Sequence, residues 1–272
     1  MEEGYSRTVW SLIAAMAALT IVSFILSDLT IAPFSNPSLL CVLAGLVIVD
    51  ASLRRARPNP RVRELVETAA QMVLVLLFGV LLTYAAMSAN FPYRDHELSM
   101  LDQALGFDRR AYLNFFEHHR WLERITELAY LSLLPQFACM PMVLQSAGRR
   151  PQAQRLLLAT GIALILTSAI SIFIPAVGAY VYIDITPGAF AKLANTIYTP
   201  VPTLESLRAG TFDVIELNNL EGLISFPSFH TVGALLFICA IWHCAPCDGR
   251  LSRSTRRLFR QPRSSAPIIS ST

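Results

Sequence analysis

The chain has 272 residues, of which 54% are hydrophobic and 15% are charged, and its formal net charge is +3. The mean hydropathy of +0.49 and the low charged fraction exclude an ordinary soluble enzyme, and they also exclude a disordered chain, which needs low hydrophobicity and a high net charge. The apolar residues are clustered in segments comparable with the about 20 residues that a helix needs to cross a bilayer. The sequence therefore predicts an all-α fold, a polytopic bundle of membrane helices.

Six apolar segments predict about six transmembrane helices. They are Val9–Leu26, Leu39–Leu53, Leu65–Met87, Ile125–Leu144, Leu156–Ile183 and Leu223–Cys244. The first is interpreted as a retained helix and not as a signal peptide, because Met1–Arg7 has two acidic residues against one Arg and no small-x-small cleavage site follows. Pro175 and Gly178 interrupt the fifth segment and predict a kink or an early exit near Pro175.

The basic residues between these segments predict an orientation. Fifteen arginines fall on the side that holds both termini: Arg7, Arg54, Arg55, Arg57, Arg61, Arg63, Arg149, Arg150, Arg155, Arg250, Arg253, Arg256, Arg257, Arg260 and Arg263. The other side holds seven basic residues: Arg94, Arg109, Arg110, Arg120, Arg124, Lys192 and Arg208. Because cytoplasmic loops are enriched in Lys and Arg, we expect a multi-pass protein of the inner membrane with both termini in the cytoplasm and with residues 88–124 and 184–222 outside.

The outer segment 88–124 has apolar residues at helical spacing, followed by aromatic residues. These are Leu98, Leu101, Leu105, Tyr112, Phe115, Phe116 and Trp121. The pattern predicts short interfacial helices whose aromatic side chains lie at the level of the lipid headgroups. In the plainer alternative, these helices only cap the bundle.

The composition changes after Cys244. Residues 1–244 form the predicted transmembrane domain. Residues 245–272 contain six Arg and no apolar stretch of even 10 residues, so they cannot span a bilayer. We expect this end to be a basic, disordered cytoplasmic tail. The chain has no basic stripe with interleaved aromatic residues, so nucleic acid is not an expected partner, and the sequence indicates no protein partner.

One segment combines residues suited to phosphate chemistry. Gly222-Leu-Ile-Ser-Phe-Pro-Ser-Phe-His230-Thr runs directly into the last apolar segment. Ser225 is expected to cap this helix, and Pro227 is tolerated in a first helical turn. The free N–H groups at a helix N-terminus attract an anion, Ser228 adds a hydroxyl donor, and His230 can protonate a leaving oxygen. These residues predict transfer of a phosphoryl group from a lipid headgroup at the outer face.

The segment Phe226-Pro-Ser-Phe-His230 resembles the second signature, Pro-Ser-x-His, of the type-2 phosphatidic acid phosphatase superfamily. Phe229, where many members have Gly, is similar to the inositolphosphotransferase branch, which includes inositol phosphorylceramide synthases. The resemblance covers about residues 85–243. It also includes Leu101-Asp-Gln-Ala-Leu-Gly-Phe-Asp108, Tyr130-Leu-Ser-Leu-Leu-Pro-Gln136, Ile174-Pro-Ala-Val-Gly-Ala-Tyr180 and Leu207-Arg-Ala-Gly210.

The resemblance implies metal-independent phosphoryl transfer through a phosphohistidine, without a cofactor, on membrane lipids such as phospholipid or isoprenoid phosphates. By this resemblance, Ser228 would bind the phosphate and His230 would act as general acid toward the leaving alcohol. The nucleophilic His and its orienting Asp would come from a third signature, Ser-Arg followed by His and Asp. A first signature, Lys followed seven residues later by Arg-Pro, supplies phosphate-binding cations in the wider superfamily.

The chain departs from the first signature. Arg57-Pro58 and Arg150-Pro151 match only its end, with Asp50 and Val143 at the Lys positions, and both lie on the wrong predicted membrane face. Arg208 lies on the predicted outer side and is our candidate substitute ligand for the phosphate. The alternative for Arg208 is a surface ion pair with an acid such as Glu205 or Asp213.

The chain also departs from the third signature. Ser252-Arg253 matches its start, but Phe259 stands where its His would fall and no Asp follows. We therefore expect the chain, as given, to be catalytically incomplete, which suggests a frameshift or a premature end of the coding sequence. Two other functions stay open at this point. They are a non-catalytic, degenerate membrane protein and a small transporter, although transporters often show paired broken helices in two related halves.

No metal site is expected from the sequence. His118 and His119 are adjacent and point apart on a helix. The Cys pair in His243-Cys-Ala-Pro-Cys247 lacks the further ligands that zinc needs. The other cysteines, Cys41, Cys139 and Cys239, lie inside apolar runs, where cysteine usually behaves as a small hydrophobic residue.

Overall fold

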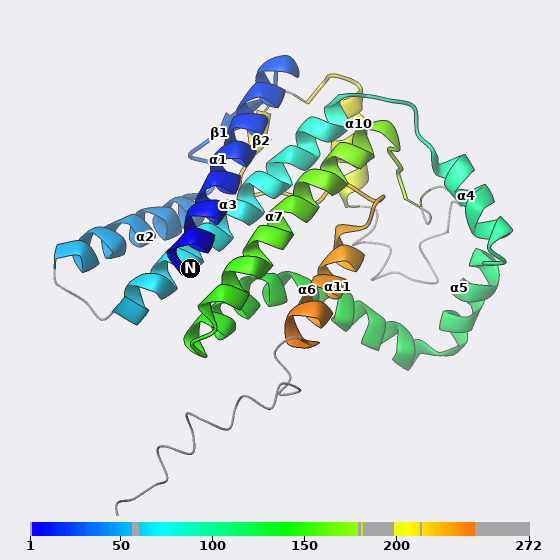
Figure 1. Ribbon diagram of the computed structural model, residues 1–272. Coiled ribbons are helices and arrows are strands. Elements are labelled where there is room, and N and C mark those ends of the chain that lie inside the picture. Colours follow the sequence, from blue (N-terminus) through cyan, green and yellow to red (C-terminus); the bar gives the residue numbers. More distant parts are fainter. Residues whose placement is uncertain (1, 56–59, 179–180, 182–198, 213, 243–272) are drawn as a thin grey trace, which may run out of the picture.

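The computed structural model describes residues 2–55, 60–178, 181, 199–212 and 214–242, which form helices and one pair of short strands (Figure 1). The helices are α1 (Glu2–Leu26), α2 (Pro37–Arg55), α3 (Pro60–Ser88), α4 (Asp95–Ala104), α5 (Arg109–His118), α6 (Arg120–Ser146), α7 (Arg150–Phe173), α10 (Pro200–Arg208) and α11 (Phe229–Trp242). The strands β1 (Thr30–Ala32) and β2 (Val214–Glu216) pair in parallel. The predicted all-α membrane bundle is confirmed.

Each predicted span contains a helix, but the helices differ in length. Four of them are long and apolar enough to cross a membrane: Gly4–Leu26, Pro60–Ser88, Arg120–Ser146 and Arg150–Phe173. The other two, in α2 and α11, have apolar parts of only Pro37–Leu53 and Phe229–Ala240. At 1.5 Å per residue these two are shorter than the about 30 Å of a hydrocarbon core.

Two predicted boundaries change. Helix α7 ends at Phe173, so the early exit expected near Pro175 is confirmed, but the expected helix does not continue to Ile183. Helix α11 begins at Phe229 and not at Leu223. The reason in the second case is that Leu223 packs into a buried cluster as part of an irregular segment, and helical hydrogen bonds start only beyond Ser228.

Helix α3 lies at the centre of the bundle and packs against α1, α2, α6, α7 and α10 (Figure 1). Small residues set the closest approaches. A side chain at Gly79 of α3 would overlap Leu164 of α7, and one at Gly161 of α7 would overlap Leu12 of α1. Close backbone approach at small residues is how helices gain van der Waals contact where the surrounding lipid is as apolar as they are.

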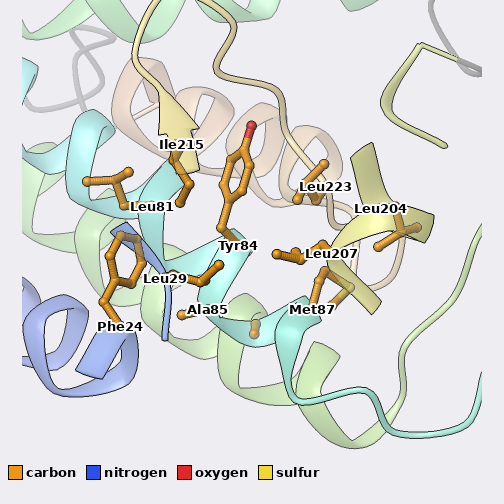
Figure 2. Close-up of a cluster of buried hydrophobic side chains, with 11 residues drawn as sticks. Phe24, Leu29, Leu81, Tyr84, Ala85, Met87, Leu204, Leu207, Ile215 and Leu223 are labelled. Atoms are coloured by element: carbon orange, nitrogen blue, oxygen red, sulfur yellow. The ribbon is translucent and has the colours of Figure 1, made fainter. Parts of the chain in front are cut away.

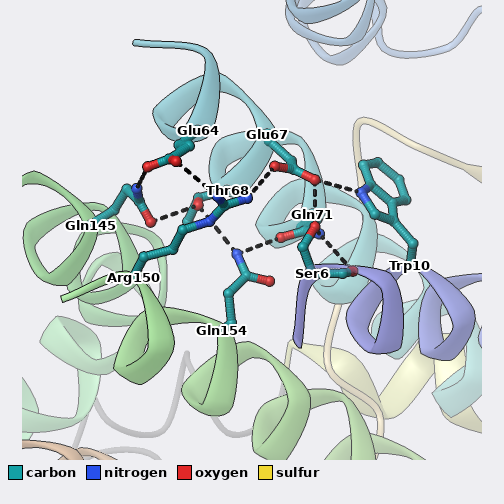
Figure 3. Close-up of polar contacts among 9 residues, drawn as sticks. All are labelled: Ser6, Trp10, Glu64, Glu67, Thr68, Gln71, Gln145, Arg150 and Gln154. Atoms are coloured by element: carbon teal, nitrogen blue, oxygen red, sulfur yellow. Dashed lines mark hydrogen bonds and ion pairs between the residues drawn. The ribbon is translucent and has the colours of Figure 1, made fainter. Parts of the chain in front are cut away.

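A network of polar side chains joins one end of the bundle (Figure 3). Arg150, at the start of α7, donates from its two Nη atoms to Glu64 and Glu67 of α3, each at 2.8 Å. Glu67 also accepts hydrogen bonds from Ser6 and Trp10 of α1. The further members are Thr68, Gln71, Gln145 and Gln154. This network holds the N-terminal ends of α1, α3 and α7 beside the C-terminal end of α6.

The opposite end is closed by an apolar cluster centred on Tyr84, which is 1% exposed (Figure 2). The cluster combines side chains from α1, α3, α10, β2 and the segment before α11: Phe24, Leu29, Leu81, Tyr84, Ala85, Ala86, Met87, Leu204, Leu207, Ile215 and Leu223. Ser88 and Ser27, at the C-terminal ends of α3 and α1, are hydrogen-bonded at 2.9 Å. Leu204, Leu207 and Ile215, which belong to a segment predicted to be external, therefore lie at the end opposite to the Arg150 network.

Helices α4 and α5 form an arm that follows α3 and leads round to α6 (Figure 1). Large apolar side chains of this arm and of the first turn of α6 are exposed, including Leu105 at 84% and Trp121 at 63%. The ring of Tyr112 contacts the rings of Phe107 and Phe116. This exposure fits the interfacial position predicted for the arm, because such side chains are enriched where lipid headgroups meet water.

Candidate functional site

The site is built around the start of α11, where Ser228 is the N-cap residue. The Ser228 Oγ accepts a hydrogen bond from the backbone N–H of Thr231 at 3.4 Å, and the Ser228 carbonyl accepts from Val232 at 3.2 Å. The prediction that Ser225 caps this helix is wrong, because the chain is not helical until Phe229. The peptide bond between Phe226 and Pro227 is cis.

Several hydrogen-bond donors lie together at this helix start. Within the described residues, the backbone N–H groups of Phe229 and His230 have no acceptor, as is usual for a first helical turn. The hydroxyl of Ser228 and the imidazole of His230 are both half-buried. The structure thus brings two of the three predicted site residues to one position, where an anion would meet N–H donors and the positive end of the helix dipole.

The imidazole of His230 lies flat against the phenol ring of Tyr130 in α6, with 4.0 Å between the ring centroids and 12° between the planes. The neighbouring Phe229 stacks in the same way on Phe137, about two turns further along α6. The ring centroids are 4.9 Å apart and the planes make an angle of 17°. Tyr130 was part of the segment that carried the family resemblance, but no functional role was predicted for it. The stacking contact depends on how α6 and α11 pack, which the sequence alone does not give.

Asp95 anchors the segment that lies beside the Pro-Ser-x-His loop. Its carboxylate is 6% exposed and accepts the backbone N–H groups of Val177 and Gly178, both at 3.0 Å. The Oγ of Ser225 donates to the carbonyl of Val177 at 3.2 Å. Gly178 has φ of +110°, and a side chain there would contact Ser225, so glycine is required for this close approach. No local motif in the sequence marks Asp95, because its contacts lie more than 80 positions away.

Arg208 lies apart from the start of α11 in its contacts. It ends α10, and its Nη2 donates to the carbonyl of Phe91 at 2.6 Å, while the guanidinium lies over the Tyr93 ring at 4.0 Å. Its Nη1 is buried and has no hydrogen-bond partner within the described residues. The alternative of an ion pair with Glu205 is not observed, and Asp213 lies outside the described residues.

The surroundings of Arg208 are electrostatically mixed. Burial raises the pKa of the Tyr93 phenol above its ordinary value, and the positive charge of Arg208 opposes this effect. Glu205 and Asp95 act on Tyr93 in the same direction as burial. The Arg208 guanidinium is therefore stacked on the Tyr93 ring, in a region that also holds the acids Glu205 and Asp95. Its Nη1 group is still available to an acceptor.

The remaining candidates lie elsewhere. Arg150 belongs to the polar network at the opposite end of the bundle. Each of His118 and His119 has its Nδ1 2.7 Å from a backbone carbonyl of α5. In the part of the chain that the structure describes, no group of three His, Cys, Asp or Glu residues is placed to hold a metal. The residues 57–58 and 243–272 lie outside that part, including the partial third signature.

Comparison with protein families gives one finding. A model of the PAP2 superfamily matches residues 96–252, which is more than half of the chain and includes Tyr130, Arg208, Ser228 and His230. The matched region begins 11 residues later and ends nine residues later than the 85–243 expected from the motifs. Neither the curated proteins nor the solved structures contain a match to this chain.

Proposed function

Because the chain belongs to the PAP2 superfamily, we propose that it is a membrane protein that binds the phosphate group of a lipid at the start of α11. The observation that carries this proposal is the N-terminal turn of α11, where Ser228, two free backbone N–H groups and His230 lie together within the family's Pro-Ser-x-His motif. An anion at a helix N-terminus gains typically about 0.3–1 kcal/mol from the dipole, and charge-assisted hydrogen bonds add to this.

The proposed chemistry is phosphoryl transfer without a metal or cofactor. Ser228 and the backbone N–H groups hold the phosphate oxygens, and a protonated His230 donates its proton to the alcohol oxygen as the phosphorus–oxygen bond breaks. The phosphoryl group passes to a nucleophile, for which the family uses a second histidine. The half-buried ring of His230, next to the free N–H groups, supports this role.

We propose in addition that this polypeptide binds phosphate better than it turns over phosphate esters. Residues 245–272 contain no His, and Phe259 stands at the position of the nucleophile. The covalent step requires a nucleophile, and none of these 28 residues supplies the histidine that the family uses. A binding protein without catalysis is therefore the second candidate function. The similarity of Phe229 to the inositolphosphotransferase branch suggests a phospholipid whose phosphate carries a polar alcohol, and isoprenoid phosphates are the other lipid class.

Arg208 is proposed as a second cation for the phosphate, or for a neighbouring anionic group of the same lipid. Its free Nη1 supports this proposal, because a buried N–H group without an acceptor is costly unless a ligand satisfies it. We further propose that this end of the bundle faces outward from an inner membrane. The gathering of the Arg-rich connections at the opposite end supports that orientation.

Two measurements on the purified full chain in detergent test the proposed function. The first is the thermal shift caused by phosphate or vanadate, which we expect for the wild-type protein and not for Ser228→Ala or His230→Ala. The second is phosphate release from phosphatidic acid, which we expect to be equally low for the wild type and for His230→Ala. The matched controls are Ser146→Ala and His118→Ala, whose side chains hydrogen-bond only within their own helices in the described structure.

The outcomes separate the candidates. A ligand-induced shift that is unchanged in both site variants would remove the α11 site. Robust release of phosphate that His230→Ala abolishes would instead show that the chain is a complete enzyme, and would refute the proposal of binding without turnover.

A further inference from the structure

The helix pair α6–α11 presents His230 to the proposed phosphate site in one fixed orientation. Tyr130, Leu133 and Phe137 lie on one face of α6, and they meet His230, Gly233 and Phe237 along α11. The spacing of three or four residues on both helices places successive contacts one turn apart. The register of the two helices therefore decides which side chain lies under the imidazole.

Gly233 makes this register possible. A side chain at that position would overlap the ring of Phe137 and come within 3.2 Å of Leu133. The ring of Phe137 also packs between Phe229 and Phe237, at 4.9 Å and 4.6 Å between centroids. With α11 held this closely, the stacking of Tyr130 on His230 follows from the same packing and is not an isolated contact.

The stack has two physical consequences for the imidazole. A parallel ring covers the face of His230 but leaves its edge free, and both ring nitrogens lie on that edge. Neither nitrogen has a hydrogen-bond partner within the described residues. In addition, the negative face of a phenol ring attracts a cation and so favours the protonated imidazole, which opposes the effect of burial, since burial lowers the pKa of His230.

The charged groups of the packed helices do not compete with this effect. Arg150 and Arg155 of α7 lie at the other end of the bundle, in contact with α3 and with Tyr5. Glu127, one turn before Tyr130 on α6, forms no ion pair with His230 in the described structure. Tyr130 is the titratable side chain that contacts the imidazole in this part of the chain.

We infer that Tyr130 is a positioning residue, which holds the imidazole of His230 edge-on to the phosphate and favours its protonated form. This inference rests on the proposed function, because it assumes that His230 contacts the phosphate. In this inference the aromatic ring of Tyr130, and not its hydroxyl group, positions His230. The two can be separated, since Tyr130→Phe keeps the ring and Tyr130→Leu removes it.

The first test compares phosphate binding by the full chain at pH 6. We expect Tyr130→Phe to bind as the wild type does and Tyr130→Leu to bind about two- to fivefold more weakly, the range that corresponds to a cation–π contact at a partly exposed site. The matched control is Tyr112→Leu, which removes from α5 a tyrosine whose ring contacts Phe107 and Phe116. Equal affinity of Tyr130→Leu and the wild type would overturn the inference.

The second test observes the imidazole of His230 directly. NMR of the chain with labelled histidines gives five imidazole signals, of which His230→Gln identifies one. We expect that signal to show an upfield ring-current shift in the wild type and in Tyr130→Phe, and to titrate at a lower pH in Tyr130→Leu. A wild-type His230 signal without the ring-current shift would overturn the inference.

The failure of the proposed function looks different. If Ser228→Ala and His230→Ala both bind phosphate normally, the site itself is wrong, whatever Tyr130 does. If these variants lose binding while Tyr130→Leu keeps full affinity and the normal titration of His230, the site stands and only the role of Tyr130 is refuted.

Discussion

The hydroxyl oxygen of Tyr84 accepts the backbone N–H of Glu221 at 3.1 Å, across 137 positions of the sequence. Tyr84 lies in the middle of the buried cluster of Figure 2, and Glu221 directly precedes the loop that carries the Pro-Ser-x-His motif. The central helix of the bundle thus fixes the residue just before that loop. This contact holds the loop of the candidate site against α3, although the two are far apart in the sequence.

We expect Tyr84→Phe to lower the free energy of unfolding by about 1 kcal/mol, the usual net contribution of one hydrogen bond. The apolar ring stays in the cluster, so the loss comes from the N–H of Glu221. We also expect a smaller thermal shift with phosphate, because the loop before α11 is less well fixed. Thermal unfolding in detergent, with Tyr112→Phe as the control, measures both effects. Identical behaviour of the two variants would show that the contact is unimportant.

The buried carboxylate of Asp95 gives a second prediction. In Asp95→Asn, one of the two oxygens that accept N–H groups of Val177 and Gly178 is replaced by an amide that donates. We expect a loss of about 1–3 kcal/mol in the free energy of unfolding, the cost of an unsatisfied buried donor. The control is Glu97→Gln on the same helix, since Glu97 is exposed and pairs only with Arg94 at 2.7 Å in the described structure.

The exposed acid of this helix, Glu97, gives a prediction for the effect of pH. The hydrogen bond from Arg94 holds the pKa of Glu97 below its ordinary value. A carboxyl group with a lowered pKa stabilises the fold above its unfolded-state pKa, and this contribution is lost as the pH falls. Because Glu97 is exposed, we expect Glu97→Gln to change the thermal midpoint little at any pH. A large effect of Glu97→Gln at neutral pH would contradict the structure.

The network of Figure 3 gives a prediction for the far end of the bundle. In Arg150→Met, two carboxylates lose their shared cation, with Glu64 and Glu67 still partly buried. We expect a loss of about 2–4 kcal/mol, since breaking a buried ion pair from one side leaves charge unpaired. The phosphate-induced thermal shift should persist, because the contacts of Ser228 and His230 in the described structure do not involve this network. A variant that keeps its stability but loses phosphate binding would instead assign Arg150 to the site.

Orientation is testable by labelling single cysteines with a reagent that does not cross membranes. In a background without the five native cysteines, we expect Asn218→Cys to be labelled in intact cells and Ala147→Cys to be protected. Both positions are exposed, in the loop after β2 and between α6 and α7. Labelling of Ala147→Cys together with protection of Asn218→Cys would reverse the proposed orientation.

Trp121 reports on the arm formed by α4 and α5. The sequence has three Trp residues, so Trp10→Phe with Trp242→Phe leaves Trp121 as the one indole fluorophore. We expect quenching of Trp121 in vesicles by lipids that are brominated near the headgroup, and weaker quenching by lipids that are brominated near the end of the acyl chain. Fluorescence without any quenching would place the arm in water and contradict the interfacial position.

Composition and hydrophobic patterning predicted the all-α membrane fold, and all six apolar segments contain helices, because long apolar runs leave the backbone few alternatives in lipid. The patterning could not predict how far a helix extends when its apolar residues are also used for packing, as at Leu223. Ser228 and His230 were identified because the motif is local. Asp95 and Tyr130 were missed as functional positions, because each acts through a contact with residues about 80–100 positions away.

The parallel pairing of β1 with β2 has a practical consequence for any attempt to isolate the region that matches the family. Thr30–Ala32 align with Val214–Glu216, so the stretch before the Pro-Ser-x-His loop is hydrogen-bonded to a segment that lies well upstream of residue 96. A fragment that begins at residue 96 would leave the β2 edge open, the hydrogen bond to Glu221 unmade and the face of α7 that packs on α1 and α3 bare. The region that matches the family is therefore shorter than the unit that folds cooperatively. We expect a fragment of residues 96–252 to aggregate on expression under conditions in which the 272-residue chain stays dispersed.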